Sequence, residues 1–332
     1  MNNNKRGITL TNLILLIVIL LICASCSIVT LSKRDYIESS KIQNLRKDIT
    51  SIQKNIEERK ILNVDSKMQK IYNLGTPELT RKYKNKIGIL NNRVVYINTK
   101  KNSLDKKEIE CLRTLGVYIV TTEGVVIPFD MYYVGGKRQT GLVISTSKED
   151  EFKGVKNTNL VGNQFVFVDT ASLEKGYVAR EEYSKIDKAT VKPYNSVQKE
   201  ECLEISESTK AYGGFYIARY EASYYKGSIA SKKSQRTDLN KQEERADGML
   251  MNFVTQSEAA NFSRNIISNN TNAKTTLPYL ASWDSIVAWI EKANDFSVNK
   301  ASKRISTVHH AELINTGVTQ ESKINNIFDL AR

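Results

Sequence analysis

The chain has 332 residues, a formal net charge of +13 and 40% hydrophobic residues. This length accommodates two modest domains beside a short anchor, because domains commonly take roughly 100–200 residues. The content of only 4 Pro and 16 Gly excludes a collagen-like or low-complexity chain, so most of it is expected to fold.

The positive charge is unevenly distributed. Residues 32–123 contain 20 Lys and Arg against 11 Asp and Glu, whereas residues 124–332 contain 27 against 25. Such an excess favours an anionic partner, either anionic lipid or a cell-wall polymer. A solvated basic stalk without a specific partner explains the same excess.

The first expected element is an apolar helix that spans a membrane. Between Arg6 and Lys33 there are 26 residues, none of them charged, and roughly 20 apolar residues are enough to cross the hydrocarbon layer. The cations that precede it predict a cytoplasmic N-terminus and an extracellular C-terminal part. We therefore expect a single-pass protein of the cell membrane, with a leader at 1–7 and a transmembrane helix at 8–32. This external location argues against nucleic acid as a partner.

The string KRGITL, followed by this apolar run, resembles the class III leader of type IV pilins and pseudopilins. The resemblance implies cleavage after Gly7, with Ile8 as the new N-terminus, and pilin-like subunits as partners. Pilins usually carry an acidic residue at the fifth position after cleavage, where this chain has Asn12. Two other routes stay open, namely lipidation of Cys26 and removal of the apolar run as a secretory peptide.

Residues 33–60 are expected to form an amphipathic stalk helix. Its apolar residues recur at intervals of three and four, which places them on one side of a helix. They are Ile42, Leu45, Ile49, Ile52 and Ile56. This stripe predicts either packing on the protein's own globular part or self-association, so with Asn12 these residues are the candidate subunit contacts.

Residues 61–123 read as a small α/β domain. The runs KIGIL and VVYIN predict a hairpin that turns at Asn91 and Asn92. Ser103 is the expected cap of a helix that ends before Gly116. No catalytic constellation is visible in this domain.

From residue 124 on, six signatures follow one another: IPFDMYYVGGKRQTGLVIS, VGNQFVFV, YGGFYIARYEAS, NFVTQSEAANFSRNI, TLPYLASWDSIVAWI and NNIFDLAR. Together they resemble the formylglycine-generating-enzyme-like, or sulfatase-modifying-factor, family. The resemblance implies a C-type-lectin-like domain at 124–332 that is incomplete at its end, since further segments follow the match to NNIFDLA in that family. The expected fold class is thus α+β, with a long transmembrane and stalk helix, a small α/β middle domain and this C-terminal domain.

Residue patterns in this region support strands and helices of the same kind. VGNQFVFV is dense enough in apolar residues to be a buried strand. Thr255 and Glu258 form the pattern of a capping box, and Ser282 is the expected cap of a helix carrying Trp283 and Trp289. Both tryptophans are expected to belong to the core rather than to a sugar-binding platform. Arg219 and Glu221 alternate on a strand and are expected to be a structural pair.

Groups suited to catalysis or metal binding are few. His309 and His310 are neighbours and cannot share one helical face, and Cys111 and Cys202 are isolated in the sequence, so we expect no metal site and no cofactor. The two cysteines are either buried thiols or a disulfide bridge.

The protein is therefore expected not to be an enzyme, but a membrane-anchored, pilin-like extracellular surface protein that displays a non-catalytic lectin-fold module. Its ligand is unknown from the sequence. The alternatives are a remnant or fragment of a formylglycine-generating-enzyme-like enzyme, and a diversified ligand-binding surface protein.

Overall fold

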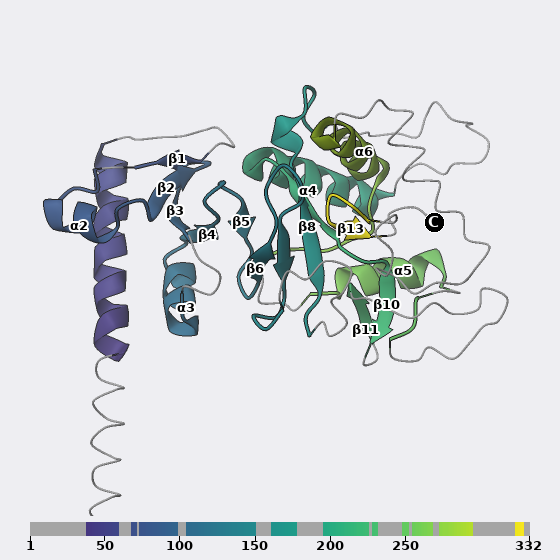
Figure 1. Ribbon diagram of the computed structural model, residues 1–332, viewed down its shortest axis with the longest axis horizontal. Coiled ribbons are helices and arrows are strands. Elements are labelled where there is room, and N and C mark those ends of the chain that lie inside the picture. The colour runs from purple at the N-terminus through teal and green to yellow at the C-terminus, as the bar shows by residue number, and fades with distance from the viewer. Residues whose placement is uncertain are drawn as a thin grey trace, which may run out of the picture.

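The computed structural model describes residues 38–59, 68–71, 73–98, 104–150, 161–177, 195–225, 228–231, 248–251, 254–267, 272–294 and 323–328. These residues form two larger β-sheets, two small hairpins and six α-helices. Figure 1 shows the first helix, drawn in purple, and the first sheet at one end of the molecule. The second sheet lies at the other end with the later helices.

The purple helix, residues 38–58, packs on the protein's own first sheet. Ile49 and Ile52 are completely buried, Leu45 and Ile56 nearly so, and Ile42 is partly buried against the same core. The apolar stripe therefore faces the chain's own core, which is the first of the two expected alternatives. Ion pairs from Lys41 to Glu108 of α3 (Lys106–Thr114) and from Asp48 to Lys82 of α2 (Pro77–Lys82) also hold the helix in place.

The first sheet has the strand order β1-β2-β3-β4-β5. Its strands are β1 (Gln69–Lys70), β2 (Ile87–Leu90), β3 (Arg93–Ile97), β4 (Tyr118–Val120) and β5 (Val126–Ile127), with α2 (Pro77–Lys82) before β2 and α3 (Lys106–Thr114) before β4. Only β3 and β4 are parallel, and α3 makes the crossover between them. Asn91 and Asn92 both have positive φ, as a two-residue hairpin turn requires, which confirms the expected hairpin.

The helix of this domain begins later than the sequence pattern indicates. Asp105, not Ser103, is its N-cap, and Asp105 and Glu108 form a capping box. Ser103 itself lies outside the described residues. The helix ends at Thr114, and Gly116 has a positive φ of 68° just beyond it, as expected.

The second sheet is antiparallel throughout and has the order β6-β7-β8-β9. Its strands are β6 (Tyr132–Gly135), β7 (Val143–Ser145), β8 (Gln164–Val168) and β9 (Phe215–Ala218). Every residue of β8 is buried, as the run VGNQFVFV predicts. One face of the sheet packs on Trp289 of α6 (Leu280–Asn294), and the other contributes Phe165 and Phe167 to the core shared with helix 38–58.

The remaining elements surround the second sheet. They are the short 3-10 helix η1 (Thr170–Ser172), α4 (Ser196–Tyr212), the hairpin of β10 (Ala222–Tyr225) and β11 (Ser228–Ser231), α5 (Gln256–Arg264), and the hairpin of β12 (Lys323–Ile324) and β13 (Ile327–Phe328). The capping box of Thr255 and Glu258 at the start of α5 is confirmed. Ser282 is not a cap, because α6 already begins at Leu280. Gly141 lets the β12–β13 hairpin pack closely against the backbone just before β7, because a Cβ at this position would clash with the Asn325 carbonyl oxygen.

The two sheets share one core and contact each other directly. The expected boundary between residues 123 and 124 runs through the first sheet, because β5 lies beyond it and pairs with β4. Tyr216 of β9 donates a hydrogen bond of 2.7 Å to the Val126 carbonyl of β5. Arg138, in the β6–β7 connection, pairs with Asp169 at 2.9 Å, and its backbone N–H donates to the Glu123 carboxylate. The hydrogen bonds of Tyr216 and of the Arg138 N–H bridge the sheets beside their shared core.

The expected fold class is therefore wrong and is corrected, for the residues that the structure describes, to a mixed α/β fold of two connected sheets with six helices. The C-type-lectin-like arrangement expected at 124–332 is replaced by the four-stranded antiparallel sheet and its flanking helices.

Across the described ranges, none of the helices combines the length and the apolarity needed to cross a membrane. Helix 38–58 is long enough but carries charged residues, among them Lys41, Lys47 and Glu57. This finding contradicts the predicted single-pass location in the cell membrane. The leader and the apolar run, with Gly7, Ile8 and Asn12, lie outside the described residues.

Candidate functional site

A fully buried arginine lies at the end of β9. The Arg219 side chain is 0% exposed, its Nε donates to the Asn326 carbonyl oxygen at 3.1 Å, and its Nη1 donates to Oε1 of Gln164 on β8. Burial lowers the pKa of the Arg219 guanidinium, an effect that Tyr220 and Asp150 oppose. The arginine thus joins β8, β9 and the last hairpin from inside the fold.

Asp150 is the acidic member of the same cluster and is only 2% exposed. Its carboxylate accepts hydrogen bonds from the Ser145 hydroxyl at 2.6 Å, from the Val161 N–H at 2.8 Å and from the Gly162 N–H at 3.2 Å. A buried carboxylate is tolerated only when it is satisfied in this way. The cluster of Arg219, Gln164, Asp150 and Ser145 is therefore an internal frame, closed to substrates by its burial.

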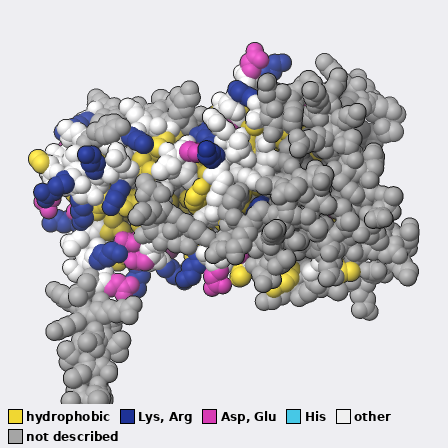
Figure 2. Space-filling view, in the orientation of Figure 1, with side chains coloured by type: hydrophobic (Ala, Val, Ile, Leu, Met, Phe, Trp, Pro, Cys, Tyr) yellow, Lys and Arg dark blue, Asp and Glu magenta, His cyan; other side chains and the backbone are white. Residues whose placement is uncertain are grey.

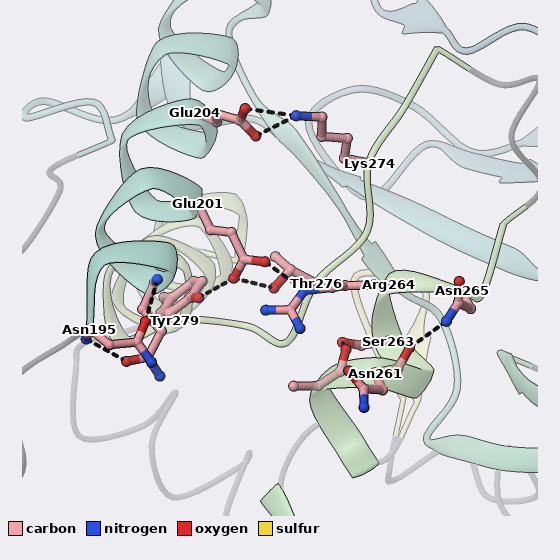
Figure 3. A network of polar contacts seen from close by, with 12 residues as sticks. Asn195, Glu201, Glu204, Asn261, Ser263, Arg264, Asn265, Lys274, Thr276 and Tyr279 are labelled. Carbon is pink, nitrogen blue, oxygen red and sulfur yellow. Dashed lines mark hydrogen bonds and ion pairs between the residues drawn. The ribbon is translucent and has the colours of Figure 1, made fainter. Parts of the chain in front are cut away.

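A second polar cluster, shown in Figure 3, centres on Glu201 of α4. Its carboxylate accepts hydrogen bonds from Arg264 Nε at 2.7 Å, from the Thr276 hydroxyl at 3.3 Å and from the Tyr279 hydroxyl. One turn along α4, Glu204 pairs with Lys274 at 2.7 Å. The cluster ties α4 to the end of α5 and to the segment that enters α6.

The electrostatics of this cluster follow from its contacts. The hydrogen bond from Arg264, followed by those from Tyr279 and Thr276, holds the pKa of Glu201 below its usual range, although burial opposes the effect. Burial and the adjacent Glu201 carboxylate raise the pKa of Tyr279 above its ordinary value. Both groups therefore keep their ordinary charge states near neutral pH, as suits a structural clamp rather than an acid–base pair.

The two described cysteines are separate and free, so the disulfide alternative is wrong. Cys111 is 3% exposed, and burial raises the pKa of its thiol. Burial and the nearby Glu201 carboxylate raise the pKa of the Cys202 thiol. Because the thiolate is the nucleophilic form, neither environment activates its cysteine.

The other candidate residues are dispersed. Trp289 is 1% exposed, and Trp283 packs partly buried against the same cluster, so both are core residues as expected. Arg219 is buried, whereas Glu221 is partly exposed. His309 and His310 lie outside the described residues, and within the described ones no group of three or more His, Cys, Asp or Glu could hold a metal ion.

Exposed cations gather on the first sheet and α2. From residue 70 to residue 93 the sequence contains six Lys and Arg and one acidic residue, Glu78. Lys82 pairs with Asp48 at 2.6 Å. The other five are exposed and are called the basic face below: Lys70, Arg81, Lys84, Lys86 and Arg93. Figure 2 shows Lys and Arg side chains over this end of the molecule.

Strand register brings part of the basic face together. Lys70 lies opposite Gly88, and Arg93 lies opposite Leu90, so both point to the same side of the sheet. Lys86 stands two residues before Gly88, and its carbonyl accepts a hydrogen bond from the Ile97 N–H, so it extends this row. In the part of the chain that the structure describes, Lys70, Arg81, Lys84 and Lys86 form no ion pair.

Sequence reasoning found the charge excess but missed both polar clusters. The partners of Glu201 stand 63, 75 and 78 residues away from it, so no local spacing connects them. Asp150 also resembles an ordinary loop acid in the sequence.

No family model, no curated protein and no solved structure matches this chain.

Proposed function

We propose that this protein is a non-catalytic binding protein that holds an anionic partner on the basic face. The observation that supports the proposal is the set of five exposed cations, which have a single acidic residue between them in the sequence. Four of these cations form no ion pair in the part of the chain that the structure describes. Charge left uncompensated on a folded surface attracts and concentrates anions.

The polar clusters of the C-terminal half support the same interpretation. Their charged groups are used to join secondary-structure elements, as Arg219 and Glu201 illustrate. The described cysteines are held as poorly reactive thiols. These side chains stabilise the C-terminal half of the chain, and the proposed function needs no reacting group.

The strength of binding follows from the number of cations. Each Lys or Arg near an anionic surface contributes about 1 kcal/mol, so five contribute roughly 5 kcal/mol. This free energy corresponds to a dissociation constant of a few tenths of a millimolar. The protein should therefore bind weakly to a single site and more strongly to a polymer that offers many overlapping sites.

The test is a titration of the full chain with polyphosphate at low salt. Lys84→Gln combined with Lys86→Gln should weaken binding roughly 30-fold, from about 1 kcal/mol lost per cation. The matched control is Lys199→Gln combined with Lys210→Gln, which removes the same charge from exposed positions on α4. Equal affinity of the two double variants would show that net charge, rather than the basic face, governs binding, and the proposal would be wrong.

A further inference from the structure

We propose that the second sheet carries a recognition site for a peptide turn, and that the chain's own β12–β13 hairpin fills this site as an exchangeable ligand. The same segment of a second copy of the chain can take its place. The site, called the hairpin slot below, consists of Thr140, Gly141, Arg219 and the apolar cluster around Trp289. Figure 1 shows the hairpin in yellow beside the second sheet. This inference goes beyond the proposed function, because it concerns a peptide on the second sheet rather than an anion on the basic face.

The hairpin is a separate unit of the fold. Among the strands that the structure describes, β12 and β13 pair only with each other. Asn325 and Asn326 at its tip have positive φ angles of 46° and 67°, as a two-residue hairpin turn requires. The strand ladder of the second sheet therefore does not include the hairpin. Its position depends on contacts of individual groups, as the position of a bound peptide does.

One residue at the tip supplies the polar contacts with the slot. The Asn326 carbonyl oxygen accepts a hydrogen bond from Arg219 Nε at 3.1 Å. The Asn326 side-chain amide donates to the carbonyl oxygens of Gly141 at 2.7 Å and Thr140 at 3.3 Å. Arg219 is 0% exposed and Asn326 is 9% exposed, so a ligand without matching groups would leave buried polar atoms unpaired. The slot thus recognises both the backbone and the side chain of an asparagine.

The next residue is the apolar anchor of the hairpin. Ile327 is 1% exposed and packs in the cluster that contains Val166 of β8 and Trp289 of α6. Gly141 completes the fit, because only a residue without a Cβ leaves room there for the Asn325 carbonyl oxygen. A buried aliphatic anchor beside satisfied polar groups is typical of the centre of a protein interface. The class of ligand is therefore a peptide in which a tight turn places an asparagine before a branched aliphatic residue.

The connection to the rest of the chain makes this ligand intramolecular. Residues 295–322 join the end of α6 to the start of β12. A tethered ligand acts at an effective concentration on the order of 1 mM when its linker spans the two sites. The chain's own hairpin therefore excludes a free peptide at micromolar concentration, and cutting the connection removes this advantage.

The experiment uses a full-length variant with a specific protease site inserted between Val308 and His309. The protein is folded first and then cut. Fluorescence anisotropy follows the binding of a labelled peptide that copies residues 319–332 and stands for the segment of a second copy. We expect this peptide to bind the cut protein at least about tenfold more tightly than the uncut protein, because the tether no longer favours the resident hairpin. We also expect gel filtration to show that the bound peptide displaces the resident fragment one for one.

The test substitutions are made in the peptide, so that the folding of the protein is not at risk. Ile327→Ala in the peptide should weaken binding about 30-fold or more, and Asn326→Ala should weaken it about tenfold. A control peptide with the same residues in scrambled order should not bind. Equal binding of the scrambled peptide or of the Ile327→Ala peptide overturns the inference.

Three other results also overturn the inference. They are a labelled peptide that does not bind the cut protein, a resident fragment that the peptide does not displace, and a native circular dichroism spectrum that is lost on cutting and not restored by excess peptide. The proposed function is tested separately, because the lysine variants of the basic face leave the hairpin slot unchanged.

Discussion

Replacing Ile52 by Ala tests whether the apolar stripe of helix 38–58 belongs to the protein's own core. Ile52 is 0% exposed and packs in the cluster that contains Leu112 of α3 and Phe165 of β8. Truncating a buried Ile to Ala costs about 2–5 kcal/mol, from lost transfer free energy and the cavity left behind. Because native domains are stable by only about 5–15 kcal/mol, this loss is a large share of the total.

The assay is urea unfolding followed by circular dichroism at two protein concentrations tenfold apart. We expect a lower midpoint with an unchanged m-value at both concentrations. Ser51→Ala, at an exposed position of the same helix, is the control and should shift the free energy of unfolding by no more than about 0.5 kcal/mol. If Ile52→Ala left the midpoint unchanged but dissociated an oligomer in sedimentation, the stripe would be a subunit contact and the reasoning would be refuted.

Three further predictions concern the polar clusters and the thiols. Glu201→Gln should cost about 1–3 kcal/mol at pH 7, because Arg264 loses its charged partner; Glu204→Gln should change the urea midpoint little. Since the folded-state pKa of Glu201 is lowered, this stabilisation is fully present above the ordinary glutamate pKa of about 4.3 and is lost as the pH falls through the folded-state value. The urea midpoints of the wild type and of Glu201→Gln should therefore converge toward pH 3. A difference between these two midpoints that stays constant with pH would contradict the clamp. Arg219→Met should cost about 3–5 kcal/mol, since it leaves the buried Asp150 without its nearby cation, and a thermal unfolding curve that matches the wild type would refute the structural role of the arginine. Alkylation followed by peptide mapping should label Cys111 only after unfolding, and rapid labelling of the native protein would be inconsistent with its burial.

Local features of the fold could be predicted from the sequence because their causes are local. The turn at Asn91 and Asn92, the capping box at Thr255 and the buried run of β8 each depend on residues within a few positions of one another. The helix cap at Asp105 was missed because Ser103, two residues earlier, satisfies the same rule.

Features that depend on distant residues could not be predicted in this way. The boundary at residue 123 was placed where the six signatures begin, but β5 pairs backward across it, and Tyr216 reaches Val126 from 90 residues away. The interaction of Arg219 with Asn326 spans 107 residues. The periodicity of apolar residues shows which face of an element is apolar, but it does not identify the element that covers this face. The shared core and the Glu201 cluster could therefore be found only in the structure.

The carboxylate of Asp150 has a consequence for engineering the chain. The Asp150 carboxylate accepts hydrogen bonds from the N–H groups of Val161 and Gly162. It thereby joins residue 150, which follows β7, to residues 161 and 162, which precede β8. Lengthening a connection whose ends are fixed costs only about 0.6 kcal/mol for each doubling of its length. Epitope tags or fluorescent reporters inserted between residues 151 and 160 should accordingly leave β7 and β8 paired, which makes this position a practical one for labelling the protein.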